Sequence, residues 1–135
     1  MKIEVIDFGY KNLPFRAHRN DAGADVYIMR DIRILSQMTV AIPLGFGLKL
    51  PDGYAAFIYP RSSLSKRGIV CQLPPIDSGY RGEIHAIVTN TSNETCQFKE
   101  GDRIGQLVVL PIVIADFVTD EEEGRGAGAF GSTGR

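Results

Sequence analysis

The sequence predicts an all-β domain, a distorted jelly roll or β-barrel with one short helix. Short segments rich in Val, Ile, Tyr and Phe recur along the chain, each bounded by Gly, Pro, Asp or Asn. Turn residues at PDG (51–53), NTSN (90–93) and KEGD (99–102) separate them at intervals typical of antiparallel sandwiches and barrels. With 135 residues, the chain is long enough for one domain with its own core.

The expected strands, in chain order, cover residues 2–7, 24–29, 33–35, 39–50, 54–59, 83–89 and 103–117. The helix is expected after Pro60, where RSSLSKRG offers a Ser cap, a polar turn and Gly68 as terminator. The last strand is apolar at nearly every position, so both its faces need cover, and a subunit interface is the simplest source of it. We place the domain at residues 1–118 and a mobile linker with a glycine-rich arm at 119–135.

Composition limits the kinds of partner. The net charge of −1 gives no overall basic field for long nucleic acid, so a phosphate ligand must meet local charge. Cys71 and Cys96 stand apart without ligand spacing, so neither a zinc site nor a disulfide framework is expected. The chain has no stretch with the apolar length of a membrane span and no signal-peptide apolar region at its start. A cytoplasmic protein without a membrane partner is expected.

One loop has the features of an anion site. The segment YPRSSLSKRG (59–68) places Arg61, Ser62 and Ser63 at a helix start. Hydroxyls, free amides and a guanidinium together can bind an anion. An ordinary Ser-capped turn would have the same sequence, so both interpretations stay open.

Two strand starts carry polar residues. In DAGADVYI (21–28), Asp25 follows a Gly turn, where it can face a divalent cation or cap the turn. In KEGDRIGQLV (99–108), a tight turn precedes Asp102, Arg103 and Gln106, and an ion pair holding that turn is the simpler interpretation for Asp102.

The segment LPPIDSGYRGEI (73–84) places Asp77 at the mouth of an apolar hairpin. A carboxylate with limited solvation there can act as a general base toward one bound water. Asp also starts turns for local reasons, and Ser78-Gly79 follows it directly. The hairpin alone does not decide between a catalytic and a turn-forming Asp77.

The end of the chain, GRGAGAFGSTGR (124–135), has five glycines in twelve residues. This composition is typical of a disordered terminus. It also suits a flap over an anionic ligand, because glycine lets amides approach phosphate, arginine supplies donors and a phenyl ring can stack on a base.

Five of these segments, in this order, resemble the motifs of the trimeric dUTPases: DAGADVYI, PRSSLSKRG, IDSGYRGEI, EGDRIGQLVVLP and RGAGAFGSTG. The resemblance covers about residues 21–134 and implies a homotrimer of jelly-roll subunits. It implies hydrolysis of dUTP to dUMP and pyrophosphate with Mg²⁺, which keeps uracil out of DNA and supplies dUMP for thymidylate synthesis. Each of three active sites would be assembled from all three subunits.

The resemblance also implies roles for residues. Asp77 matches the base that activates water for attack on the α-phosphate, Tyr80 the ring that packs on the deoxyribose and excludes a ribose hydroxyl, and Asp25 the acid that reaches Mg²⁺ through water. In the tail, Phe130 matches the aromatic that stacks on uracil, and Arg125 belongs to the γ-phosphate clamp. The complete set of expected substrate-binding residues is Arg61, Ser62, Ser63, Gln72, Pro75, Ile76, Tyr80, Ile84, His85, Gln106, Arg125, Phe130, Gly131, Ser132 and Thr133.

The sequence departs from the family pattern in three places. Pro74-Pro75 replaces a usual Gly, Gln72 stands nearest to a usual Asn, and Ala129 replaces a tail Gly. Proline donates no amide proton, so base recognition by the hairpin backbone must depend on Leu73, Ile76 and the strand near Ile84-His85.

Two other functions are compatible with the fold. A dCTP deaminase resembles the PRSS motif, but deaminases use a glutamate seven residues beyond the aromatic, where this chain has Ile87. An apolar residue cannot transfer protons, which disfavours deamination, alone or in a bifunctional enzyme. A nucleotide-binding regulatory module without catalysis is the other alternative, and Asp77 argues against it.

Overall fold

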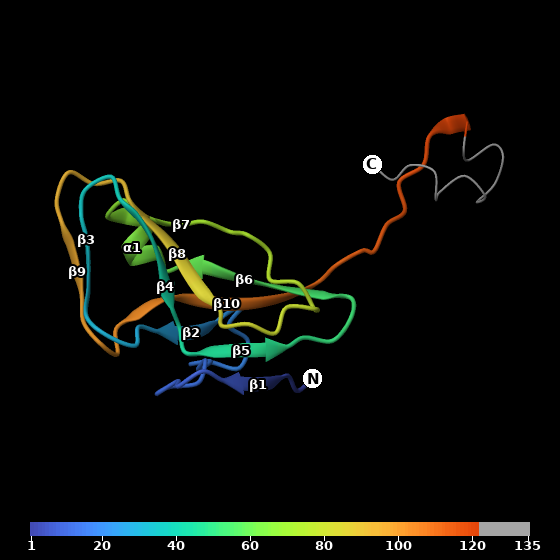
Figure 1. Cartoon of the computed structure of the whole chain (residues 1–135), viewed down its shortest axis with the longest axis horizontal. Coiled ribbons are helices and arrows are strands. Elements are labelled where there is room, and N and C mark those ends of the chain that lie inside the picture. Colours follow the sequence, from blue (N-terminus) through green and yellow to red (C-terminus); the bar gives the residue numbers. More distant parts are fainter. Residues whose placement is uncertain (122–135) are drawn as a thin grey trace.

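Ten short strands and one helix make up the described part of the chain, residues 1–121, in the computed structural model (Figure 1). The elements are β1 (Glu4–Asp7), β2 (Ala24–Tyr27), β3 (Ile32–Ile34), β4 (Thr39–Pro43), β5 (Phe46–Lys49), β6 (Tyr54–Pro60), α1 (Ser62–Lys66), β7 (Ile69–Cys71), β8 (His85–Asn90), β9 (Cys96–Phe98) and β10 (Arg103–Pro111). The all-β prediction with one short helix is confirmed.

The strands form four small antiparallel sheets around one core. Their orders are β1-β5, β2-β10-β6, β3-β9 and β4-β8-β7. In β8, buried residues alternate with exposed or half-buried ones, as expected of a sheet with one covered face. The largest fully buried side chains are Phe46, Ile28, Ile34, Ile42, Leu44, Ile84, Ile104, Val26, Val88 and Asn90.

The expected single strand over 39–50 is two strands, β4 and β5. Gly45 separates them with φ +82°, a left-handed conformation that L side chains rarely adopt. The apolar run hides this bend because residues on both sides of it are buried. The structure also adds β7 and β9, each of three residues, which are too short to show a clear alternation in the sequence.

The helix lies where it was expected, but the expected Ser cap is wrong. Arg61 is the N-cap residue, and its side chain makes no capping hydrogen bond. Its carbonyl instead accepts the amides of Leu64 and Ser65, at 3.1 and 3.0 Å. Gly68 follows the helix with φ +84°, as expected for a residue that ends one.

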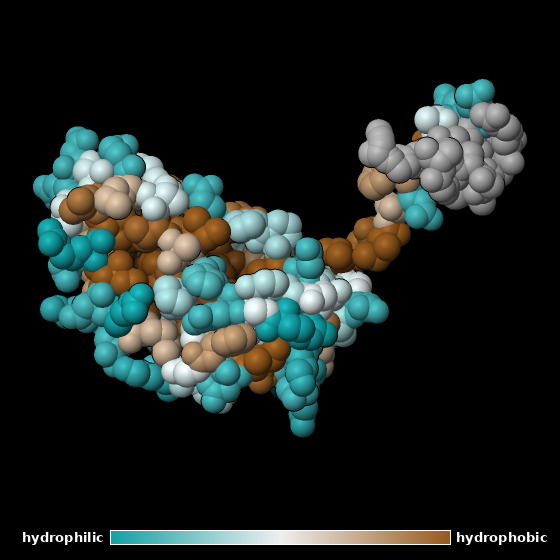
Figure 2. All heavy atoms as spheres, viewed as in Figure 1, coloured by the Kyte–Doolittle hydropathy of each residue, from teal (hydrophilic) through white to brown (hydrophobic). Residues whose placement is uncertain are grey.

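The last strand is shorter than expected, because β10 ends at Pro111 rather than at residue 117. The chain then leaves the body as an extended segment (Figure 1). Figure 2 shows apolar side chains along this segment. Val113, Ile114 and Phe117 are 89, 75 and 88% exposed, so nothing in the single chain covers them. No helix within residues 1–121 is long and apolar enough to cross a membrane.

Candidate active site

A first cavity of about 240 Å³ lies under the connection between β7 and β8, residues 72–84, which we call the hairpin loop. Seven of the expected site residues line this hairpin cavity: Gln72, Pro75, Ile76, Asp77, Tyr80, Ile84 and His85. They come from the loop and the start of β8, and Ile58 of β6 lines the cavity with them. Glu83 and Ile87 also line the cavity.

Backbone hydrogen bonds hold Asp77 at the edge of this cavity. The neighbouring Ile76 exchanges two of them with Ala56 of β6, at 2.8 and 3.0 Å. The amide of Tyr80 donates to the Asp77 carbonyl at 3.1 Å and closes a turn. Asp77 itself is exposed, so the limited solvation expected from the sequence is absent in the single chain. A ligand or a neighbouring molecule would have to exclude the water.

Two residues expected to recognise the base already use their backbone groups within the chain. Ile76 is paired with Ala56 as described, and the amide of Ile84 donates to the Phe46 carbonyl at 2.8 Å while its carbonyl accepts from Leu44 at 3.0 Å. Gln72 donates its amide to the Ile87 carbonyl at 2.8 Å and its side chain to Thr89 Oγ1 at 3.2 Å. These bonds set the shape of the hairpin cavity.

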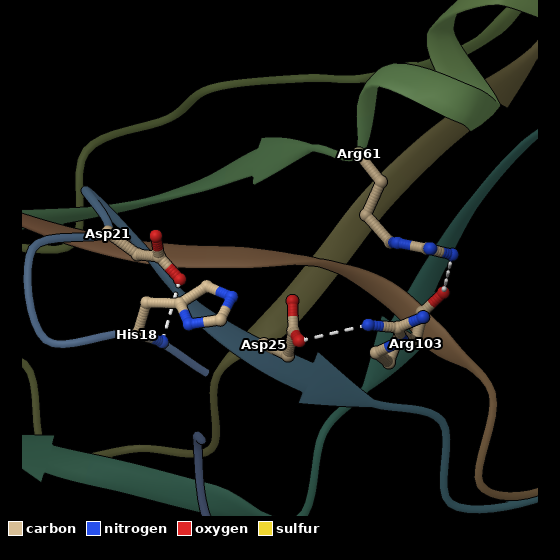
Figure 3. Close-up of polar contacts among 5 residues, drawn as sticks. All are labelled: His18, Asp21, Asp25, Arg61 and Arg103. Carbon is tan, nitrogen blue, oxygen red and sulfur yellow. Dashed lines mark hydrogen bonds and ion pairs between the residues drawn. The ribbon is translucent and has the colours of Figure 1, made fainter. Parts of the chain in front are cut away.

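A second cavity of about 610 Å³ lies where β2, β10 and the segment between β6 and α1 meet, and we call it the strand-end cavity. Asp25 of β2, Arg103 of β10 and Arg61 before α1 line it and point toward one another (Figure 3). Arg103 Nη1 lies 3.3 Å from Asp25 Oδ2, and Arg61 Nη1 lies 3.5 Å from the Arg103 carbonyl oxygen. The cavity therefore combines cations with one half-buried carboxylate.

Gln106 lies beside this cluster in the central strand of its sheet. It is the register partner of Asp25 in β2 and of Tyr59 in β6. Its Nε2 donates to the Pro60 carbonyl at 3.3 Å. A Cβ on Gly23 would lie 2.6 Å from Gln106 Oε1, so only glycine leaves the amide this position. The exposed Ser62 and Ser63 begin α1 next to Arg61.

Two aspartates in this region, Asp102 and Asp21, stabilise turns through their carboxylates. Asp102 accepts the amide of Lys99 through Oδ2 at 2.8 Å, so it closes its own turn rather than pairing with an arginine. In the loop before β2, Asp21 Oδ2 accepts the amide of His18 at 2.9 Å (Figure 3).

The metal prediction rests on Asp25 alone. Within residues 1–121, no group of three or more His, Cys, Asp and Glu side chains could hold a metal ion. A magnesium ion needs few protein ligands, because it keeps several waters and takes further oxygens from substrate phosphates. Asp25 fits such an ion, held chiefly by a phosphorylated ligand.

The two cavities share no lining residue. Asp77 belongs to one cavity, and Arg61 with Asp25 to the other. The predicted tail residues Arg125, Phe130, Gly131, Ser132 and Thr133 lie outside the described residues. Glu83, Arg67 and Phe15 also line the cavities, although the sequence patterns did not predict them as site residues. No local signal pointed to Glu83, because its carboxylate contacts Gly45, which is distant in sequence.

The comparisons with known proteins all indicate the same family. The family model for dUTPase matches residues 9–134. A deoxyuridine 5'-triphosphate nucleotidohydrolase of Thermobifida fusca (strain YX) is 44% identical over 129 residues, which cover 90% of this chain and 72% of that protein. The protein of the same name from Tropheryma whipplei (strain Twist) is 41% identical over 142 residues, covering 100% of this chain and 97% of its own length.

Solved structures share the fold. A dUTPase of the Staphylococcus aureus phage phi11, in a structure described with a structural Mg(II) ion, matches with a TM-score of 0.84 and 23% identity, covering 90% of this chain and 98% of that one. A dUTPase of Staphylococcus bacteriophage 80alpha with dUpNHpp matches with a TM-score of 0.82 and 23% identity over 99% of both chains. At this identity the match concerns the fold.

Proposed function

The chain belongs to the dUTPase family, and we propose that its active site forms where the hairpin cavity of one subunit faces the strand-end cavity of another. The reaction is hydrolysis of dUTP to dUMP and pyrophosphate. One observation carries the arrangement: Asp77 lines one cavity, Arg61 and Asp25 line another, and the two share no residue. One chain therefore holds the parts of a site in separate places.

In the hairpin cavity, Asp77 acts as the general base. Its carboxylate orients a water and takes a proton from it as the water attacks the α-phosphate. Tyr80 packs on the deoxyribose, while Gln72, Pro75 and His85 complete the cavity around the base. Since Ile76 and Ile84 use their backbone groups within the chain, they contribute apolar contact, and hydrogen bonding to the base falls to Leu73 and His85.

In the strand-end cavity, the cations bind the triphosphate. Arg61, the amides and hydroxyls of Ser62 and Ser63, and Gln106 contact phosphate oxygens. The cofactor is Mg²⁺; it would supply neutralising charge to those oxygens, and Asp25 would hold it through coordinated water. No covalent nucleophile is required, because positioning and charge neutralisation accelerate phosphoryl transfer.

The tail closes the site. Phe130 stacks on uracil, while Arg125, Gly131, Ser132 and Thr133 contact the γ-phosphate. Closure would exclude water from Asp77, which the single chain leaves exposed. Residues 119–135 then act as a linker and flap attached to the domain of residues 1–118.

In a homotrimer, neighbouring subunits would cover the apolar surface that the single chain leaves exposed. The segment after β10 carries exposed Val113, Ile114 and Phe117, and a neighbouring subunit would bury them, a change favoured at about 25 cal/mol per Å² of apolar surface. Cys71 and Cys96 are free thiols, typical of a reducing compartment, which favours a cytoplasmic enzyme.

Ile87 bears on the deaminase alternative. It lines the hairpin cavity in β8, at the position where a deaminase needs an acid. Since Ile87 offers no group that transfers protons, the cavity favours hydrolysis with Asp77 as the base over deamination.

The test of the shared site mixes two inactive proteins, Asp77→Asn and Arg61→Ala, unfolded together in equal amounts and refolded. If the two residues of a site come from different subunits, about a quarter of the sites receive both intact residues in a random assembly. Steady-state turnover of dUTP measures the recovery. If both residues come from one chain, no site recovers, and turnover equal to the mean of the two parents would refute the proposal.

A further inference from the structure

Glu83 links two residues that line the hairpin cavity, Tyr80 and His85, to the bend between β4 and β5. Its Oε2 accepts the amide of Gly45, the bend between β4 and β5, at 2.9 Å. Its carbonyl accepts the Tyr80 hydroxyl at 2.7 Å and lies 3.1 Å from His85 Nδ1. A hydrogen bond to a charged acceptor is among the stronger ones in proteins, so the carboxylate ties this turn of the hairpin loop to the body.

Tyr80 packs directly on main chain. A Cβ on Gly82 would lie 2.6 Å from the Tyr80 hydroxyl oxygen and 2.7 Å from Cζ. A Cβ on Gly47 would lie 2.6 Å from the Gly82 carbonyl oxygen. The Tyr80 ring therefore lies against Gly82, and Gly82 lies against Gly47, so that no side chain would fit at either glycine. Since backbone supports the ring, its position follows that of residues 82 and 83.

The Tyr80 hydroxyl is engaged with its own chain, so the ring and not the hydroxyl is offered to a ligand. Tyr80 remains 45% exposed and lines the hairpin cavity together with Glu83. A ring excludes an extra hydroxyl only if it cannot move aside, because the exclusion is a steric difference between two substrates. The support behind the ring is then part of the selectivity.

We propose that Glu83 is a positioning residue for sugar selectivity: it fixes Tyr80 so that the ring excludes a 2'-hydroxyl. The inference rests on the role proposed for Tyr80. The carboxylate acts through the Gly45 amide and the turn, and does not itself touch the substrate.

The experiment measures kcat/KM for dUTP and for UTP in wild type, Glu83→Ala, Glu83→Gln and Tyr80→Ala. Glu83→Ala is expected to lower the dUTP/UTP ratio by about tenfold, which corresponds to about 1.4 kcal/mol of discrimination. The change comes mainly from a lower KM for UTP. Glu83→Gln is expected to restore most of the ratio, since its amide oxygen can still accept the Gly45 amide.

The matched control is Glu94→Ala. Glu94 is exposed in the loop between β8 and β9, and its hydrogen bonds with Asn90 and Ser92 use its backbone carbonyl and amide. It should keep the wild-type ratio. An equal loss in this variant would overturn the inference, as would an unchanged ratio in Glu83→Ala.

Tyr80→Ala separates the inference from its premise. A ratio lowered in Tyr80→Ala but unchanged in Glu83→Ala overturns only the role of Glu83. A ratio unchanged in Tyr80→Ala overturns the role proposed for Tyr80, and the inference with it. If Glu83→Ala does not fold, Glu83→Asp, whose carboxylate is one methylene too short to keep the bond to the Gly45 amide, must still lower the ratio, and an unchanged ratio there rejects the proposal.

Discussion

Asp77 owes its position to its neighbours in the chain. Within residues 1–121 no hydrogen bond or ion pair holds its carboxylate, whereas its carbonyl accepts the Tyr80 amide and Ile76 is pinned to Ala56. A base must reach a water and release it within one reaction cycle, so a carboxylate without structural partners suits the role. By contrast, Asp102 binds the amide of Lys99 and is a turn residue.

We predict that Asp77→Asn lowers kcat for dUTP by about 10²–10⁴, the range for loss of a general base. The amide has the same shape, so the turn and the cavity stay intact and the Kd for a dUTP analogue with a non-hydrolysable bond should change little. Stopped-flow turnover and calorimetric titration measure the two quantities. Asp52→Asn, in the exposed turn before β6, is the matched control, and an unchanged kcat in Asp77→Asn would end the assignment.

At the same scale, the sequence predicted which site residues gather but not their contacts. Gln72, Asp77, Tyr80 and His85 all line one cavity, as motif proximity along the chain suggests. The link from Glu83 to Gly45 spans two separate elements, and no local pattern encodes it. Likewise, burial raises the pKa of Cys71 to about 11, an effect of packing that its solitary place in the sequence does not reveal.

At the scale of elements, the sequence predicted most of the strands, including the short β1, β2 and β3, and missed the bend at Gly45, the strands β7 and β9, and the end of β10. β6 and β8 are recognisable in the sequence because each is a largely apolar run bounded by turn residues. The bend at Gly45 was hidden because Pro43, Leu44 and Phe46 continue the apolar run through it. β9 is visible only through its pairing with β3, which depends on the closed fold.

We predict that Gly45→Ala destabilises the protein by about 2–4 kcal/mol. The left-handed φ of +82° costs a side chain about 1–2 kcal/mol, and a Cβ there would meet the Met29 side chain at 2.8 Å and the Tyr10 Cα at 2.9 Å. Gly53→Ala is the matched control, because Gly53 has φ +87° but open space around its Cβ. Gly53→Ala should lose only the stability that a side chain costs at a left-handed φ.

Urea unfolding at one fixed protomer concentration measures both glycine variants, since assembly adds to apparent stability. The difference in the free energy of unfolding between the two variants gives the cost of the contacts that a Cβ at Gly45 would make with Met29 and Tyr10. Equal losses of stability would mean that Met29 and Tyr10 move aside freely, contrary to the prediction.

At the scale of the whole molecule, two features of the single chain support the proposed assembly from several subunits. Its two cavities hold different residues of the proposed site, and the apolar segment after β10 extends away from the body (Figures 1 and 2). The apolar pattern of the sequence predicts that the residues after β10 need cover, whereas the pairing of cavities between subunits depends on how copies of the chain dock. Mixed assemblies can also determine which subunit contributes the tail to each site.

The tail prediction uses a chain stopped after Glu123, which lacks residues 124–135. It is co-refolded in equal amounts with Asp77→Asn in one mixture and with Arg61→Ala in another. Each parent is expected to be inactive, because the tail supplies the aromatic and phosphate contacts proposed for Phe130 and Arg125. Size-exclusion chromatography with light scattering, and mass spectrometry of the assemblies, verify that mixed trimers form.

If the tail, the hairpin cavity and the strand-end cavity of one site come from three different subunits, both mixtures recover about a quarter of the sites, since each of two required parts is intact with a probability of about one half. Recovery with Asp77→Asn but not with Arg61→Ala would place the tail over the strand-end cavity of its own chain, and the opposite result would place it over its own hairpin cavity. Either result contradicts a site built from three subunits. Activity of the truncated chain alone would contradict the flap itself, because residues 124–135 would then be dispensable for turnover.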